Sequence, residues 1–181
     1  MTTEAQPYRL ADVAGRHSSE EILDTDVSRL VNAAKEIASI EAPLHVTDLT
    51  GRIGHMWGVG RVGSRIAAKV MQGIHTAARR GAIELRGEFV WVPGQGCTVR
   101  SRSGTGISAE RISPEEYQEA IVQTLREAGV LPRDELIAAV RSLLGFSRTG
   151  PVLEECIGRA IGVLLTAGRL GEGSGGITFR E

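Results

Sequence analysis

Hydrophobic and polar positions follow two similar patterns, one in each half of the chain. In each half, an amphipathic helix precedes a shorter second helix, and a glycine-containing turn leads into a longer third helix. The helices are expected at about 27–40, 46–57 and 62–80, and again at about 114–128, 133–144 and 149–167. Gly81 and Gly168 follow the third helices, where a C-terminal glycine commonly stands. The pattern predicts two copies of one helical module.

A β-hairpin is expected after each third helix. In the first half, two short alternating segments flank a tight turn at Arg86-Gly87, and residues 169–179 form a weaker version of the same pattern. Three helices, the second and third joined by a tight turn, followed by a hairpin make a helix-turn-helix with a wing. The predicted fold class is α+β, mainly α, with two tandem winged-helix modules.

An internal repeat relates the two halves. The run Gly58-Val59-Gly60-Arg61-Val62-Gly63 aligns with Gly145-Phe146-Ser147-Arg148-Thr149-Gly150, 87 residues further on. The same separation pairs apolar core positions, such as Leu49 with Leu136 and Ile74 with Ile161. Two copies at so long a period indicate paired domains, not a solenoid.

The repeat divides the chain into four segments. Residues 1–26 are interpreted as a polar N-terminal arm or linker, 27–93 as the first module, 94–112 as a Gly/Ser-rich linker and 113–181 as the second module. Ser113, Pro114 and Glu116 carry the residue types of a helix start, with Glu116 completing a capping box.

Charge differs between the segments although the net charge of the 181 residues is -1. Residues 42–103 contain nine Lys/Arg and three Asp/Glu, whereas residues 113–181 contain seven and ten and residues 1–41 contain four and eight. The near-neutral total argues against a strongly basic nucleic-acid binder, but it conceals a basic first module between acidic flanks.

The third helix of the first module carries the candidate DNA-binding face. Its polar residues lie within about an 80° arc, opposite an apolar face that can pack on the other helices. In helix-turn-helix proteins this helix enters the major groove, and cations on it contact phosphates and guanine edges. With the wing residue, the candidate DNA-binding residues are Arg61, Ser64, Arg65, Lys69, Gln72, Thr76, Arg79 and Arg86. The alternative is an ordinary solvated helix face.

The corresponding positions of the second module are less polar. Val152, Cys156 and Val163 stand where the first module has Arg65, Lys69 and Thr76. An apolar stripe at such positions suggests burial against protein, so these three residues form the candidate protein interface. The covering surface is the first module, a second copy of the chain or another partner; alternatively, the wing covers these side chains.

No catalytic or metal-binding arrangement emerges from the reactive residue types. The histidines, His17, His45, His55 and His75, are interpreted as structural or surface residues. Cys97 and Cys156 form no CxxC pair and no zinc-ligand cluster. The glycine runs lack the following Lys-Ser/Thr of a phosphate-binding loop. No stretch reaches the length of a membrane span. The chain is therefore expected to be a non-enzymatic cytoplasmic protein without cofactor or metal.

Several runs of the chain resemble a known family. They are Ala42-Pro43-Leu44-His45-Val46, Trp57-Gly58-Val59-Gly60-Arg61-Val62-Gly63-Ser64-Arg65-Ile66, Ala78-Arg79-Arg80-Gly81, Phe89-Val90-Trp91-Val92-Pro93 and Leu144-Gly145-Phe146-Ser147-Arg148-Thr149-Gly150. These residues resemble a bacterial domain of unknown function found near the C-terminus of large proteins that also carry a superfamily 1 helicase core and a short-patch-repair-like endonuclease domain.

The resemblance implies an accessory DNA-binding module serving a helicase or nuclease in DNA repair or phage defence, with no catalytic residue of its own. Pro151 replaces the serine that stands at Ser64 in the first copy. The expected partners are duplex DNA together with a helicase, a nuclease or a second copy of the chain. A protein-interaction or dimerisation adaptor without direct DNA contact is the alternative function.

Overall fold

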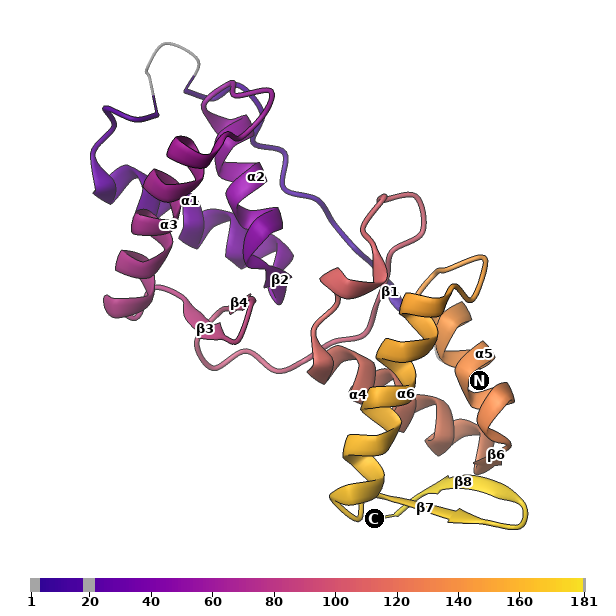
Figure 1. Ribbon diagram of the computed structural model, residues 1–181. Helices are drawn as coiled ribbons and strands as arrows, with labels where there is room; N and C mark the ends of the chain where they lie inside the picture. The colour runs from indigo at the N-terminus through magenta and orange to yellow at the C-terminus, as the bar shows by residue number, and fades with distance from the viewer. Residues whose placement is uncertain (1–3, 18–21, 181) are drawn as a thin grey trace. The chain divides into compact units, whose positions relative to one another are not determined.

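The computed structural model describes residues 4–17 and 22–180 and divides the chain into two compact units (Figure 1). The N-terminal unit is Arg9–Gly96, and the C-terminal unit combines Met1–Tyr8 with Cys97–Glu181. Over the described ranges the fold is mixed α/β, with six α-helices that hold about half of the chain and three small sheets. No helix in these ranges is long and apolar enough to cross a membrane.

The N-terminal unit consists of three helices and one small antiparallel sheet. The helices are α1 (Val27–Glu41), α2 (Val46–Met56) and α3 (Ser64–Arg79), and the strands are β2 (Leu44–His45), β3 (Glu84–Arg86) and β4 (Phe89–Trp91). The sheet order is β2-β4-β3, so the strand between α1 and α2 pairs with the last strand of the unit. The expected hairpin around Arg86-Gly87 is confirmed as β3 and β4.

Packing between α1 and α3 forms the centre of this unit. The α1 helix begins where the carboxylate of Asp26 accepts a 2.7 Å hydrogen bond from the Ser28 amide, which is a common N-terminal cap. Leu30 is fully buried, and a Cβ added at Gly73 on α3 would stand 2.5 Å from the Cβ of Leu30. The glycine therefore lets the two helices approach closely, and this contact decides which face of α3 is buried.

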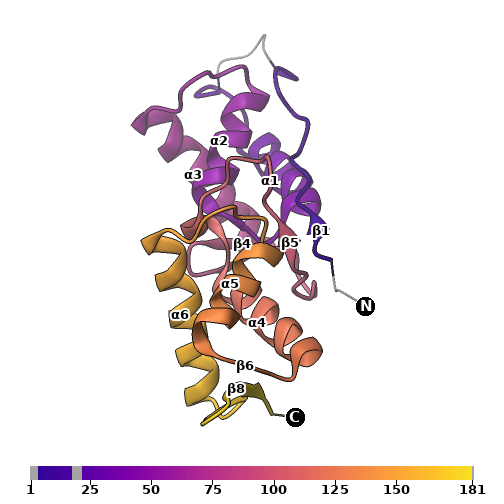
Figure 2. The same cartoon turned by 90° about the vertical axis from the view of Figure 1, so that its right-hand side faces the viewer.

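The C-terminal unit has the same order of elements (Figures 1 and 2). Its helices are α4 (Pro114–Ala128), α5 (Arg133–Leu143) and α6 (Pro151–Thr166), and its antiparallel sheet contains β6 (Val130–Leu131), β7 (Leu170–Gly173) and β8 (Gly176–Phe179) in the order β6-β8-β7. A 3-10 turn, η1 (Ala109–Arg111), and a short parallel pair, β1 (Gln6–Pro7) with β5 (Arg100–Ser101), complete the unit.

The internal repeat extends to helix bounds and strand register. Each helix of the C-terminal unit begins and ends 87 residues after its counterpart, as in Val27–Glu41 and Pro114–Ala128. The pairing of Leu44 with Val90 recurs as Leu131 with Ile177. The predicted order of helices is confirmed in both halves. The short strands β2 and β6 add a third strand to each hairpin.

Both third helices begin two residues later than the apolar pattern predicts. Gly63 and Gly150 stand just before them with extended backbone, at ψ 170° and 165°, and act as the N-terminal caps. Periodicity detects the apolar positions of a helix, whereas the backbone conformation of the cap residue decides where the helix starts. Arg61 consequently belongs to the turn before α3 and not to the helix.

The segments outside the two helical patterns are also part of the compact units. From the segment interpreted as an arm, Val13 and Ile22 enter the core of the N-terminal unit and Tyr8 is buried in the C-terminal unit. From the segment interpreted as a linker, Val99 and Ile112 enter the core of the C-terminal unit. Residues 1–3 and 18–21 of the arm lie outside the described residues. Isolated apolar residues among polar ones show no periodicity, so their burial was not evident from the pattern.

The turn between α5 and α6 packs against the segment that follows β5. Arg102 donates its backbone N–H to the Leu144 carbonyl at 2.9 Å. The neighbouring Gly145 has a φ of +82°, and a Cβ at this position would stand 2.7 Å from the Ser103 backbone nitrogen and 2.2 Å from the Ser101 hydroxyl. Gly145 therefore satisfies both a left-handed backbone and a close contact with another segment.

This double requirement predicts a large effect of Gly145→Ala. We expect it to lower the free energy of unfolding by about 3 kcal/mol or more, because backbone strain and a backbone clash add together. Gly168→Ala is the matched control: Gly168 has a φ of +73° but open space around a Cβ, so a loss of about 1–2 kcal/mol is expected. Urea unfolding followed by far-UV circular dichroism measures both. Equal losses would show that the contact with Ser101 and Ser103 is unimportant.

Candidate nucleic-acid interface

The outer face of α3 carries most of the candidate DNA-binding residues. Ser64, Arg65, Gln72 and Arg79 are exposed, and Arg61 is exposed in the turn that precedes the helix. On the opposite side, Val70, Gly73, Ile74 and Ala77 are buried. The helix is therefore amphipathic, and its solvent side presents cations and hydrogen-bonding groups.

Lys69 and Thr76 lie at the edge of this face and are partly buried. The Thr76 hydroxyl donates a 2.7 Å hydrogen bond to the Gln72 carbonyl and accepts a 2.9 Å hydrogen bond from the Arg79 guanidinium. Thr76 thus holds Arg79 against the helix surface. Among the described residues, no acidic side chain forms an ion pair with Arg61, Arg65 or Lys69.

One acidic residue nevertheless influences the edge of the face. The pKa of Asp26 is held below its usual value of 3.8, first by the hydrogen bond from the Ser28 amide and further by the positive charges of Lys69 and Arg80. Asp26 therefore belongs to the electrostatic environment of Lys69, although it lies far from it in sequence.

Arg86 is engaged within the hairpin. Its Nε and Nη2 each lie 3.1 Å from a carboxylate oxygen of Glu84, and its guanidinium lies over the Trp91 ring at 4.5 Å. The hydrogen bonds from Arg86 also lower the pKa of Glu84. This arrangement directs Arg86 along the sheet, so a contact with a phosphate would require it to leave Glu84.

The exposed face also includes residues that the sequence pattern did not single out. Ala68 and His75 are exposed on α3, and Arg80 is exposed at its end. Lys69 and Thr76 stand four and three residues from Gly73, which packs against Leu30 of α1, so both lie at the edge of the α1 contact and the exposed face extends away from them. A helical-wheel plot of the sequence does not show which residues of α3 face α1, so it does not predict that Ala68, His75 and Arg80 are exposed.

Arg100 and Arg102, which contribute to the basic count of residues 42–103, do not lie on an exposed surface. Both guanidiniums bind the carboxylate of fully buried Glu116, with Arg100 Nη2 at 2.8 Å and Arg102 Nη2 at 2.7 Å from Oε2. Both also lie over the Tyr8 ring, at 4.7 and 4.9 Å. These four residues form a buried ionic cluster. Glu116 thus faces arginines instead of closing the expected capping box, while Ser113 still accepts a hydrogen bond from the Glu116 amide.

The unit boundaries change the charge balance around α3. The N-terminal unit contains eleven Lys/Arg and ten Asp/Glu, because it includes the acidic residues before α1 and excludes Arg100 and Arg102. Within it, however, residues 49–83 contain six Lys/Arg and no Asp/Glu. Positive charge is therefore a property of the α2–α3 segment and not of the whole unit.

The corresponding face of α6 is apolar at two positions. Val152 and Val163 are 50% and 49% exposed, and Cys156 between them is partly buried. Burial raises the pKa of Cys156, and the hydroxyl of Tyr117 lies beside its sulfur. The three candidate interface residues therefore lie along one side of α6, with the valines more exposed than the cysteine.

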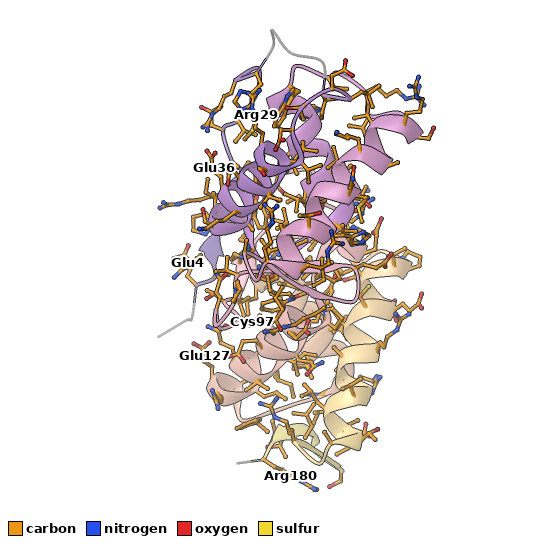
Figure 3. All side chains as sticks on the ribbon, turned by 90° about the vertical axis from the view of Figure 1, so that its left-hand side faces the viewer. Glu4, Arg29, Glu36, Cys97, Glu127 and Arg180 are labelled. Atoms are coloured by element: carbon orange, nitrogen blue, oxygen red, sulfur yellow. The ribbon has the colours of Figure 1, made fainter. Side chains whose placement is uncertain are left out.

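A shallow groove lies elsewhere on the C-terminal unit. Glu4, Cys97 and Glu127, labelled in Figure 3, line it together with residues of α4. Burial, and then the charge of Glu116, raise the pKa of Cys97 to about 12. The thiol is therefore protonated near neutral pH and is a poor nucleophile. Across the described ranges, no three His, Cys, Asp or Glu side chains come together as a potential metal site.

Comparison with known proteins gives one match. A family model described as a protein of unknown function (DUF3320) matches residues 20–68, about a quarter of the chain. The match covers α1, α2, the glycine turn and the first residues of α3, including Arg61, Ser64 and Arg65. Neither the curated proteins nor the solved structures gave a significant match. Resemblance to a domain of unknown function is thus confirmed over the first two helices and the start of α3.

Proposed function

We propose that the chain is a non-catalytic DNA-binding protein built from two winged-helix modules, at residues 27–93 and 113–181. Each unit has a helix, a short strand, two helices joined by a glycine turn and a hairpin whose last strand pairs with the first strand. A helix-turn-helix uses its second helix for the major groove. In the N-terminal unit that helix is α3.

The observation that carries the proposal is the exposed basic face of α3. Arg65 and Arg79 are exposed on α3 and Arg61 is exposed in the turn before it, within a segment that contains no acidic residue. In addition, the first turn of α3 has no side-chain cap in the described structure, so its backbone N–H groups also point toward an approaching anion. Cations next to such a helix start match the phosphate backbone of duplex DNA.

The two modules have different proposed roles. The apolar positions Val152 and Val163 replace Arg65 and Thr76, so the C-terminal unit contacts protein and not DNA. The resemblance to domains of helicase and endonuclease proteins favours an accessory role beside such an enzyme in the bacterial cytoplasm, in DNA repair or phage defence. A pure protein adaptor is the competing function and requires no affinity for DNA.

Binding of the whole chain to a duplex of mixed sequence across a salt series tests the proposal. We expect a dissociation constant of about 10⁻⁴ to 10⁻⁶ M at physiological salt. The logarithm of the binding constant should fall with the logarithm of salt concentration with a slope of about -3.6 to -4.5, as four or five phosphate contacts require. Fluorescence anisotropy of a labelled duplex measures both quantities. Absence of binding at low salt would contradict the proposal and favour the adaptor.

A further inference from the structure

The exposed side of α6 is unusual within this protein. Other large apolar side chains exposed in the described structure, such as Ile40 and Val130 at 44% and 48%, belong to separate elements. Val152 and Val163 instead share one side of one helix, with Cys156 between them. Two half-exposed valines about 16 Å apart along a helix make a stripe that a single globular contact can cover.

The spacing along this stripe matches a helix-pair interface. Val152, Cys156, Arg159 and Val163 are separated by four, three and four residues, the repeat that keeps one side of a helix against a partner helix. In α3 the same positions are Arg65, Lys69, Gln72 and Thr76, which are all polar. The stripe is therefore specific to the second copy of the fold.

The stripe on one α6 helix matches the stripe on a second α6 helix that runs in the opposite direction. If two α6 helices lie antiparallel about a centre between Ile157 and Gly158, Val152 of one faces Val163 of the other, and Cys156 faces Arg159. Each valine then meets a valine from the opposite end. The antiparallel arrangement also brings each helix N-terminus beside the partner's C-terminus, which favours the interaction of the helix dipoles.

The charged residues of α6 also match their counterparts in the antiparallel arrangement. Glu155 and Arg159 lie on the exposed side of α6, 67% and 71% exposed, and form an ion pair at 2.6 Å within the helix. In the antiparallel arrangement, Glu155 of one helix lies at the level of Arg159 of the other, about one residue apart along the axis. Two such pairs form a four-charge network at the edge of the valine contacts. A parallel arrangement would instead place Glu155 beside Glu155 and Arg159 beside Arg159.

From this self-complementarity we infer that α6 is the dimerisation surface of the protein and that its partner is the α6 of a second copy, packed antiparallel. The inference rests on the proposed role of the C-terminal unit in protein contacts and names the partner. A single helix pair buries less than a standard interface, so the dimer forms in the micromolar range. A dimer also carries two α3 surfaces, which strengthens binding to long DNA through two linked contacts.

Sedimentation equilibrium of the whole chain over a concentration series tests the inference. The expected result is a reversible monomer–dimer equilibrium that Val152→Glu/Val163→Glu weakens at least about 100-fold, because each copy then buries two charges that face the like charges of the other copy. Ile40→Glu/Val130→Glu is the matched control: it places the same charges at equally exposed valine and isoleucine positions off α6, and should leave the equilibrium unchanged. A wild-type chain that stays monomeric overturns the inference, as does an equal effect of the control.

Cysteine cross-linking tests the orientation, with Cys97 and Cys156 both changed to Ser. Val152→Cys/Val163→Cys should form a disulfide-linked dimer under mild oxidation, whereas Val152→Cys alone should not. The two positions on one helix are too far apart for an internal disulfide. Cross-linking of the single variant, or none in the double variant, overturns the antiparallel pairing. The duplex-binding assay separates this inference from the proposed function, since a monomer that binds DNA refutes only the dimer.

Discussion

Changing Arg61, Arg65 and Lys69 together to Glu is expected to lower the affinity for duplex DNA about 100-fold or more at low salt. Each of these cations replaces counterions on the phosphate backbone. The loss of three contacts therefore also makes the slope of the logarithm of the binding constant against the logarithm of salt concentration shallower by about 2.7. The reversed charges then repel the backbone. Arg61 and Arg65 are exposed and Lys69 is partly buried, whereas the buried side of α3 carries Val70 and Ile74.

A second triple variant controls for overall charge. Arg148, Arg169 and Arg180 are exposed in the C-terminal unit, and changing them to Glu alters the net charge by the same amount. If α3 is the contact surface, this control should lose less than about 3-fold in affinity at equal salt. Equal losses in both variants, measured by anisotropy on the same duplex, would show that binding depends on total charge and not on α3. Circular dichroism of both variants verifies that they are folded.

The second large effect is expected at the buried ionic cluster. Glu116→Gln should lower the free energy of unfolding by about 3–5 kcal/mol, because it leaves the guanidiniums of Arg100 and Arg102 buried together without their carboxylate. The Glu116 carboxylate also accepts a 2.8 Å hydrogen bond from the Arg100 amide, which the variant weakens. Urea unfolding followed by far-UV circular dichroism measures the loss.

Two controls isolate this effect. Glu115→Gln removes the same charge from the same turn of α4, but Glu115 is not buried, and a change within about 0.5 kcal/mol is expected. Trp57 and Trp91, the two tryptophans, both belong to the N-terminal unit, so their fluorescence reports that unit. We expect the fluorescence transition of Glu116→Gln to match wild type. A loss as small as that of Glu115→Gln would show that the cluster contributes little.

The same cluster predicts how stability depends on acid. Burial by itself raises the pKa of Glu116, but the hydrogen bonds and charges of Arg102 and Arg100 outweigh burial and hold the pKa below the usual value of 4.5. A carboxylate whose pKa is lower in the folded state stabilises the fold fully above its unfolded pKa. This stabilisation disappears as the pH falls through the folded pKa. The difference in stability between wild type and Glu116→Gln should therefore shrink below pH 4.5.

The exposure of the candidate DNA-binding residues could be predicted where they share one helix, whereas the burial of other charged residues depends on distant segments and could not. The polar side of α3 follows from the spacing of Arg65, Gln72 and Arg79, because a helix repeats every 3.6 residues. Arg100 and Arg102 gave no such signal, since arginines in a Gly/Ser-rich segment resemble solvated charges. Their burial follows from Glu116 and Tyr8, which lie far from them along the chain.

The sequence by itself determined the order of the helices, the glycine turns and the separation of 87 residues between the two copies. These features are local, because apolar periodicity and the backbone freedom of glycine act within a few residues. The tertiary structure alone decided that β2 and β6 join the hairpins, that Val13 and Ile22 belong to a core, and which charges reach solvent. Each of these outcomes requires contacts between distant segments, and the free energy of burial depends on what surrounds a side chain and not on its neighbours in sequence.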